Sequence, residues 1–135
     1  MGDTSDRERE GVPDEGDVIT YERTFSIEEV RRFGEITRDQ QPIHTELDED
    51  GRLIVQGLLT GSLMTKIGGD LNYMARTMEY EFRRPVYTGE TITCELTVES
   101  MTEQADRYLL ENDVVYRNEE GDVVVDAATT GLIWK

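Results

Sequence analysis

Apolar residues in the first part of the chain alternate at first and then recur at helical spacing. The loose alternation of Val18 to Phe25 predicts an edge strand. The spacing over residues 27–36 predicts a short amphipathic helix, for which Ser26 is the expected N-cap. Pro42 cannot continue that helix, so residues 39–44 are expected to form a turn or an extended loop.

A second helical segment, residues 54–75, is apolar on nearly every side and carries no charge before Lys66. Such a helix is normally buried, and its glycines allow other parts of the chain to approach closely. The pair Gly68 and Gly69 is expected to end or bend it. The pattern therefore predicts a long central helix inside the fold.

From Thr77 onward, apolar and polar residues alternate as they do in strands. The clearest strand is Thr91 to Glu99, whose apolar and polar residues lie on opposite faces. Three further strands are predicted at residues 78–82, 107–117 and 123–134, with turn residues between them. This order of elements predicts an α+β fold in which one antiparallel β-sheet wraps around the central helix.

The chain of 135 residues is long enough for one domain with its own core. Residues 1–17 hold seven acidic side chains and few large apolar ones, so we expect a flexible acidic tail before a single domain at residues 18–135. One cysteine excludes an internal disulfide and is compatible with a reducing compartment. There is no apolar run of membrane-spanning length and no signal peptide, so a cytoplasmic location is expected.

The charge of the chain narrows the class of partner. Acidic side chains number 30 against 14 basic ones, which gives a formal net charge of −16. Repulsion at this charge disfavours nucleic acid and anionic membranes as partners. Only Lys66 and Lys135 are lysines, and an acidic, lysine-poor surface is typical of a protein from a high-salt cytoplasm; an ordinary acidic protein is the alternative.

The segment with candidate chemistry is residues 33–44, which contains the single histidine of the chain, His44, five positions after Asp39. A carboxylate and an imidazole that share one water can act as a general acid–base pair. Since Asp and His are common in polar loops, spacing alone favours the simpler alternative of a surface histidine near an unrelated aspartate.

Gly57 and Ser62 are further candidates, at the start of the central helix. Free N–H groups there stabilise partial negative charge, and Gly57 would let a thioester carbonyl come close. Ser62, about one turn later, would donate a hydrogen bond into the same site. The alternatives are a glycine that packing requires and a serine that bonds a backbone carbonyl.

Three blocks of this sequence resemble MaoC-like hotdog-fold proteins, a family that includes the (R)-specific enoyl-CoA hydratases. Residues 33–44 resemble the hydratase motif, which runs aromatic, small, any, aliphatic, Ser/Thr, Gly, Asp, any, Asn, Pro, aliphatic, His. Residues 56–63 look like the start of the family's central helix, usually His-Gly-Met before apolar residues, and residues 82–90 resemble its Phe-x-x-Pro-Val-x-x-Gly-Asp strand and turn. The matched motif positions are Phe33, Gly34, Ile36, Thr37, Asp39, Pro42, Ile43 and His44.

The resemblance covers about residues 18–135 and implies the hotdog fold. It also implies roles for four residues. Asp39 and His44 match the catalytic pair of the family. Gly57 matches the residue whose backbone N–H polarises the thioester carbonyl, and Ser62 matches a serine that lines the site.

Three positions depart from the family pattern. Arg38 replaces the glycine before the catalytic aspartate, Gln41 replaces an asparagine, and Gln56 replaces the histidine before Gly57. The positive charge of Arg38 beside Asp39 would lower the pKa of that carboxyl. Both acid–base residues are retained, so the departures bear on substrate range and loop geometry.

The resemblance implies a hydratase that interconverts trans-2-enoyl-CoA and (R)-3-hydroxyacyl-CoA, with Asp39 as base and His44 as acid. No metal or organic cofactor is implied, since CoA is part of the substrate. The alternatives are an acyl-CoA thioesterase of the same fold and a non-catalytic acyl-CoA binding module.

The resemblance also implies a homodimer with two sheets joined edge to edge, or a higher homo-oligomer. The exposed edge of a single wrapped sheet supports this expectation independently. Arg83, Arg84 and Lys66 are candidate contacts for the phosphates of CoA, and surface ion pairing is the alternative for all three.

Overall fold

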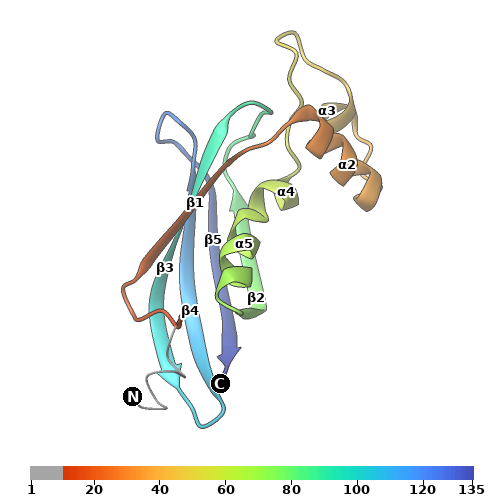
Figure 1. Ribbon diagram of the computed structural model, residues 1–135. Coiled ribbons are helices and arrows are strands. Elements are labelled where there is room, and N and C mark those ends of the chain that lie inside the picture. Colours follow the sequence, from red (N-terminus) through yellow and green to blue (C-terminus); the bar gives the residue numbers. More distant parts are fainter. Residues whose placement is uncertain (1–10) are drawn as a thin grey trace.

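The computed structural model describes residues 11–135, and the predicted tail before residue 11 lies outside the described residues. Its centre is one five-stranded antiparallel sheet with the strand order β1-β3-β4-β5-β2 (Figure 1). The predicted α+β fold, with a sheet wrapped around a central helix, is confirmed. The strands are β1 (Val18–Thr24), β2 (Met74–Phe82), β3 (Thr91–Glu103), β4 (Arg107–Arg117) and β5 (Val123–Trp134).

The alternation of apolar and polar residues explains how the strands pack. Along β3 the residues Ile92, Cys94, Leu96 and Val98 are buried, while their polar neighbours are exposed or half-buried. β4 and β5 have the predicted bounds, but β3 continues beyond residue 99. A bulge between Val98 and Ser100 interrupts the strict alternation there, so the pattern stopped before the strand did.

The central helix consists of α4 (Gly57–Gly61) and α5 (Leu63–Asp70), which lie along one face of the sheet (Figure 1). The backbone of Ser62 between them keeps helical angles, with φ −63° and ψ −10°. The predicted helix is thus confirmed over residues 57–70. Its expected flanks belong to other elements: Ile54 bridges to Tyr87, and β2 begins before Thr77.

The other two helices lie beyond one end of the sheet. α2 (Ile27–Thr37) begins with the capping box of Ser26 and Glu29. α3 (Pro42–Thr45) is a short helix where a turn or extended loop was expected. Residues 39–41 form the expected loop, but the expectation was wrong from Pro42 onward, because a proline at the first helical position loses no hydrogen bond and can start a helix.

Residues 11–17 contact the sheet. Val12 packs against the core, the N–H of Gly16 donates to the carbonyl of Val98 at 2.8 Å, and the N–H of Val98 donates to the carbonyl of Asp17 at 2.9 Å. This part of the predicted tail is therefore attached to β3. Within residues 11–135, no helix is long and apolar enough to cross a membrane.

Candidate active site

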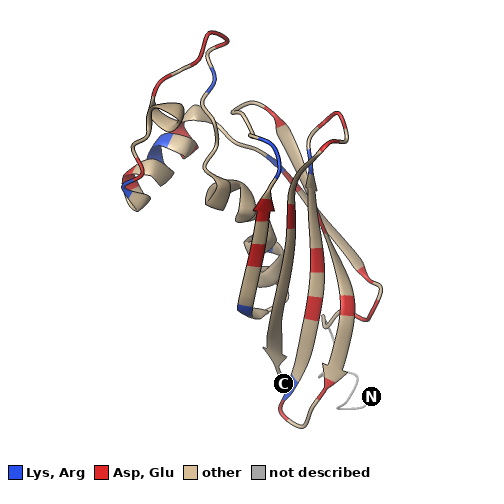
Figure 2. Cartoon of the chain, turned by 180° about the vertical axis from the view of Figure 1, so that it is seen from behind, with Lys and Arg blue, Asp and Glu red and all other residues tan. Residues whose placement is uncertain are grey.

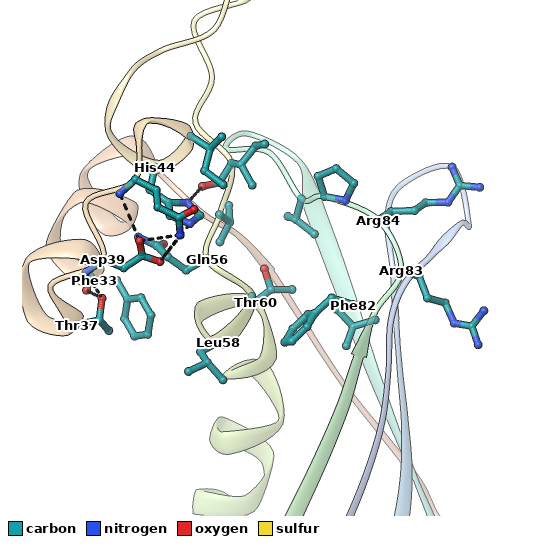
Figure 3. Close-up of a pocket in the computed structure, with 18 residues that line it drawn as sticks. Phe33, Thr37, Asp39, His44, Gln56, Leu58, Thr60, Phe82, Arg83 and Arg84 are labelled. Carbon is teal, nitrogen blue, oxygen red and sulfur yellow. Dashed lines mark hydrogen bonds and ion pairs between the residues drawn. The ribbon is translucent and has the colours of Figure 1, made fainter.

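A pocket of about 530 Å³ lies where α2 and α3 approach the start of α4 (Figure 3). The segment that follows β2 forms the opposite wall. Residues from all three sequence blocks line the pocket: Asp39 and His44 from the first, Gly57 from the second, and Arg83 and Arg84 from the third. The fold therefore brings together residues that are far apart in the sequence.

His44 is held by a hydrogen bond to the backbone. Its side chain is buried, and ring Nδ1 lies 2.6 Å from the carbonyl oxygen of Ile54. Because a carbonyl oxygen can only accept, Nδ1 carries a proton and donates it, which leaves Nε2 free for chemistry. Nε2 lies 3.6 Å from Oδ2 of Asp39, so the two atoms can contact the same water.

Asp39 is held by Gln41. The side-chain Nε2 of Gln41 donates to Asp39 Oδ1 at 2.9 Å and to Oδ2 at 3.2 Å, and its backbone N–H donates to Oδ1 at 3.3 Å. Chiefly through the side-chain bond, Gln41 holds the pKa of Asp39 below its ordinary value, with a smaller contribution from His44 and against the effect of desolvation. Asp39 is therefore a carboxylate at neutral pH.

Arg38 ends α2 by its backbone conformation. It caps α2 in the left-handed conformation, with φ 69°. Glycine adopts this conformation without strain, which gives a physical reason for a glycine at the matching position of the family motif. The expected effect on Asp39 is not found, because Arg38 does not contribute to the lowered pKa of that carboxyl.

Gly57 is the first residue of α4, so its N–H has no acceptor within the helix. A Cβ at this position would lie 2.8 Å from Cε1 of Phe82, and a Cβ at Gly61 would lie 2.7 Å from Cε1 of Tyr80. The two rings are stacked with centroids 5.7 Å apart. Packing against Phe82 therefore requires a glycine at position 57, as the simpler alternative held. Gly57 also lines the pocket.

Sequence reasoning missed two polar residues of this pocket, Gln56 and Thr60, which are 4% and 1% exposed. Gln56 Nε2 donates to the carbonyl of Val30 at 2.9 Å and so ties the start of α4 to α2. Gln56 Oε1 and Thr60 Oγ1 have no hydrogen-bond partner among residues 11–135. Sequence treated Gln56 only as a departure and did not single out Thr60, because an unpaired buried atom becomes visible only once its surroundings are folded.

Two predicted site residues lie elsewhere. Ser62 Oγ donates to the carbonyl of Leu59 at 2.6 Å and does not line the pocket, which agrees with the simpler alternative for that serine. Lys66 forms an ion pair with Asp70 and lies over the ring of Tyr21, 5.4 Å from its centroid. The structure does not bring either residue to the pocket.

Arg83 and Arg84 lie at the rim, and Figure 3 shows their side chains pointing outward. Arg83 pairs with Asp126 and Glu81, and Arg84 lies 3.8 Å from Asp122. Both arginine side chains are at least half exposed. Over the described part of the chain, no three His, Cys, Asp or Glu side chains are grouped closely enough to hold a metal ion.

No protein-family model matches the chain. Two curated relatives are distant. The mitochondrial 3-hydroxyacyl-[acyl-carrier-protein] dehydratase of Arabidopsis thaliana is 24% identical over an alignment of 128 positions that covers 87% of this chain and 76% of the relative. The corresponding dehydratase FERN of Solanum lycopersicum is 25% identical over the same lengths.

Solved structures share the fold. The (R)-hydratase from A. caviae involved in PHA biosynthesis superposes with a TM-score of 0.79 at 20% identity, covering 92% of this chain and 98% of that one. A chain of the ChsH1-ChsH2 complex from Mycobacterium tuberculosis has a TM-score of 0.73 at 20% identity, over 89% and 97% of the two chains. A MaoC-like dehydratase from Rhodospirillum rubrum has a TM-score of 0.63 at 20% identity, over 91% and 94%.

The solved structures establish the fold, and the curated relatives add a distant similarity in sequence over most of the chain. The chain thus has the hotdog fold of a solved (R)-hydratase and of a solved MaoC-like dehydratase, and it is distantly similar in sequence to the plant dehydratases.

Proposed function

We propose that this protein is a hydratase that interconverts trans-2-enoyl-CoA and (R)-3-hydroxyacyl-CoA by acid–base addition of water. The observation that carries the proposal is the separation of 3.6 Å between His44 Nε2 and Asp39 Oδ2 on the wall of the pocket. A water between these atoms would meet a proton acceptor and a proton donor at once. The fold shared with an (R)-hydratase supports the (R) configuration.

The hydrogen bonds around the pair support one direction of proton transfer. Asp39 is ionised at neutral pH because its pKa is lowered, so it accepts a proton from water. His44 enters the hydration step with protons on both ring nitrogens: Nδ1 keeps its proton on the carbonyl of Ile54, and Nε2 carries the proton that is transferred. In hydration the water oxygen bonds to C3, Asp39 takes one water proton, and His44 Nε2–H protonates C2. The proton then passes from Asp39 back to His44.

Addition of water places negative charge on the thioester oxygen until C2 is protonated. The N–H of Gly57, at the start of α4, is available to that oxygen. A donor that is fixed in place stabilises such charge without reorganisation. Gly57 is therefore the proposed site for the thioester carbonyl.

The proposed carrier of the acyl group is CoA. Arg83 and Arg84 at the rim are the candidates for its phosphates, because guanidinium groups match phosphate oxygens. On binding CoA, each would release its present carboxylate partner, Asp126 or Asp122, and bind a phosphate instead. Lys66 is left out of this role, since it pairs with Asp70 away from the pocket. Acyl carrier protein is the second candidate carrier, because the plant relatives are named for it.

We also propose that two copies associate through β2 into a homodimer, which is compatible with higher homo-oligomers. β2 is an edge strand, and Met74, Met78 and Phe82 on it are 56%, 44% and 51% exposed. An edge strand with exposed apolar side chains invites pairing with another strand. Pairing with the β2 of a second copy would join the two sheets and cover these side chains.

Substitution of the acid–base pair tests the proposal. Asp39→Asn and His44→Gln are each expected to lower kcat for hydration of short- and medium-chain enoyl-CoA by about 10²–10⁴-fold, as for the loss of a general acid or base. The loss of enoyl absorbance measures the rate, and circular dichroism checks the fold. Asp50→Asn, in an exposed carboxylate paired with Arg52, is the matched control. Hydration at nearly the wild-type rate by either pocket variant would reject the pair.

The same reaction mixtures separate the alternative functions. A thioesterase releases a free thiol that a thiol-reactive dye detects, whereas a hydratase consumes the enoyl absorbance without releasing thiol. Faster turnover of the enoyl group on acyl carrier protein than on CoA would assign the carrier differently. Tight binding of enoyl-CoA without turnover at any salt concentration would favour a binding module.

A further inference from the structure

The pocket contains a hydroxyl group to which the proposed mechanism assigns no role. Thr60 lies on α4 and is 1% exposed, and its Oγ1 has no hydrogen-bond partner among residues 11–135. A helical threonine commonly bonds a carbonyl one turn earlier. Here the carbonyl of Gln56 accepts the backbone N–H of Thr60 at 3.0 Å, but the hydroxyl makes no such bond. Buried polar groups are normally paired, so this one requires an explanation.

Helix geometry directs Thr60 toward Gly57. Residues three positions apart share one face of a helix, and their side chains tilt toward its N-terminus. The hydroxyl of Thr60 therefore lies over the turn that Gly57 begins, and both residues line the pocket. Figure 3 shows the Thr60 side chain on the pocket side of α4, between Gln56 and Phe82.

The hydrogen-bond donors and acceptors around the Thr60 hydroxyl indicate which atom of a thioester it would bind. The N–H of Gly57 can only donate, and the unpartnered Oε1 of Gln56 can only accept, whereas a hydroxyl can do either. A thioester carbonyl oxygen only accepts, and it has two lone pairs. Once one lone pair is bound by Gly57, the hydroxyl of Thr60 can serve the other.

We propose that the Thr60 hydroxyl is a second hydrogen-bond donor to the thioester carbonyl oxygen, acting beside the N–H of Gly57. This inference rests on the proposed hydratase function. The hydroxyl keeps its proton throughout and forms no covalent bond to the substrate. Two donors that are fixed in place before the reaction stabilise the developing negative charge more than one donor does.

Thr60→Val removes the hydroxyl and keeps the shape, while Thr60→Ser keeps the hydroxyl and removes a methyl group. We expect Thr60→Val to lower kcat for enoyl-CoA hydration by about 10²-fold, as for the loss of one oxyanion donor, and Thr60→Ser to stay within a few-fold of wild type. Thr97→Val, the same change on β3 outside the pocket, should have wild-type kcat. Thr60→Val should unfold at the same or a higher temperature, because it removes an unpaired buried hydroxyl.

A second measurement reports the carbonyl directly. The absorbance of a bound cinnamoyl-CoA chromophore shifts to longer wavelength when its carbonyl is polarised, so wild type and Thr60→Ser should show a larger shift than Thr60→Val. Equal rates and shifts in wild type and Thr60→Val would overturn the inference. Equal losses in Thr60→Val and Thr60→Ser would overturn it too, because the hydroxyl would then be irrelevant.

The chromophore also separates failure of the inference from failure of the proposed function. A wild-type protein that polarises the chromophore through Thr60 but hydrates no enoyl thioester would retain the role of Thr60 and reject the hydratase. A wild-type protein that binds no thioester would reject both.

Discussion

Asp39 and His44 each depend on a neutral partner for their orientation. The carbonyl of Ile54 determines which ring nitrogen of His44 is protonated, and the amide of Gln41 holds the carboxylate of Asp39. Neither partner carries a charge. Salt would therefore not screen the two hydrogen bonds that orient the pair, which suits a protein of high net charge.

At the scale of the residue, Gln41→Leu should raise the pKa of Asp39 toward its ordinary value, because the Gln41 side chain is the largest cause of the lowered pKa. Hydration needs the ionised carboxylate, so activity falls as the pH drops through the pKa of Asp39. The acid limb of the kcat/KM profile should therefore move to higher pH in the variant.

Gln41→Asn keeps an amide and is the matched control. Its acid limb should lie at lower pH than that of Gln41→Leu. If wild type and Gln41→Leu had the same acid limb, the amide would not control the ionisation of Asp39.

At the scale of the element, α4 and β2 pack together because the spacing of residues along the helix matches the spacing along the strand. Four residues of a helix rise by about 6 Å, and two residues of a strand advance by about 6.6 Å. Gly57 and Gly61 are four apart, Tyr80 and Phe82 are two apart, and each ring packs on one glycine. This contact holds the start of α4, with the N–H of Gly57, against the edge strand.

Gly61→Ala is expected to destabilise the wild-type fold by about 1–3 kcal/mol, because the new Cβ would lie 2.7 Å from Cε1 of Tyr80. In a Tyr80→Ala background the same change should be neutral or stabilising, since alanine favours a helix over glycine by about 1 kcal/mol. Urea unfolding of the four proteins measures the coupling between the two positions. An equal cost in both backgrounds would show that the ring of Tyr80 is not the reason for the glycine.

The proposed pairing of two copies through the edge strand β2 can be tested separately. Met78→Asp should shift the protein from dimer to monomer in sedimentation experiments, because a charge would be buried between the paired strands. Val18→Asp is the control, since Val18 is 54% exposed on β1 at the opposite edge of the sheet. A stable dimer of Met78→Asp, or dissociation of Val18→Asp instead, would contradict association through β2.

At the scale of the whole molecule, negative charge is spread over the sheet. Figure 2 shows Asp and Glu positions, in red, on several neighbouring strands, with few Lys or Arg positions between them. Glu99 and Asp113 lie close enough on β3 and β4 that hydrogen bonding to Asp113 and repulsion from it raise the pKa of Glu99. The folded protein thus keeps carboxylates together that an unfolded chain would separate.

The raised pKa of Glu99 makes the stability of the fold depend on pH. The folded state binds the proton of Glu99 more tightly than the unfolded state, so the pair favours folding at acid pH and opposes it once the pH rises through the raised pKa. Added salt should therefore raise the melting temperature at neutral pH. Asp113→Asn should raise it further at low salt and hardly at all at molar salt, where the screening length is about 3 Å.

Thermal unfolding of wild type and Asp113→Asn from low to molar salt measures both effects. A wild-type melting temperature that falls steadily as salt rises would contradict a role for charge repulsion, and with it the expected high-salt habitat.

The helix and strand pattern was largely predictable from the sequence, because burial of one face leaves a period in the residues themselves. The bounds of β4 and β5 could be predicted in this way, and so could the central helix. The apolar–polar pattern did not predict irregular backbone geometry, such as the bulge after Val98 and the left-handed conformation of Arg38. Asp39 and His44 were predicted as a pair from the resemblance of residues 33–44 to a family motif, whereas their spacing alone favoured an unrelated aspartate.

Only the tertiary structure decided which polar atoms meet at the pocket. Lys66 and Thr60 lie two turns or less apart on the central helix, yet Lys66 pairs with Asp70 in solvent while Thr60 is buried at the pocket without a partner. The physical reason is that the surroundings of a side chain come from distant segments, here the strands packed beside the helix. Periodicity records which face of an element is buried, and it does not record what lies opposite that face.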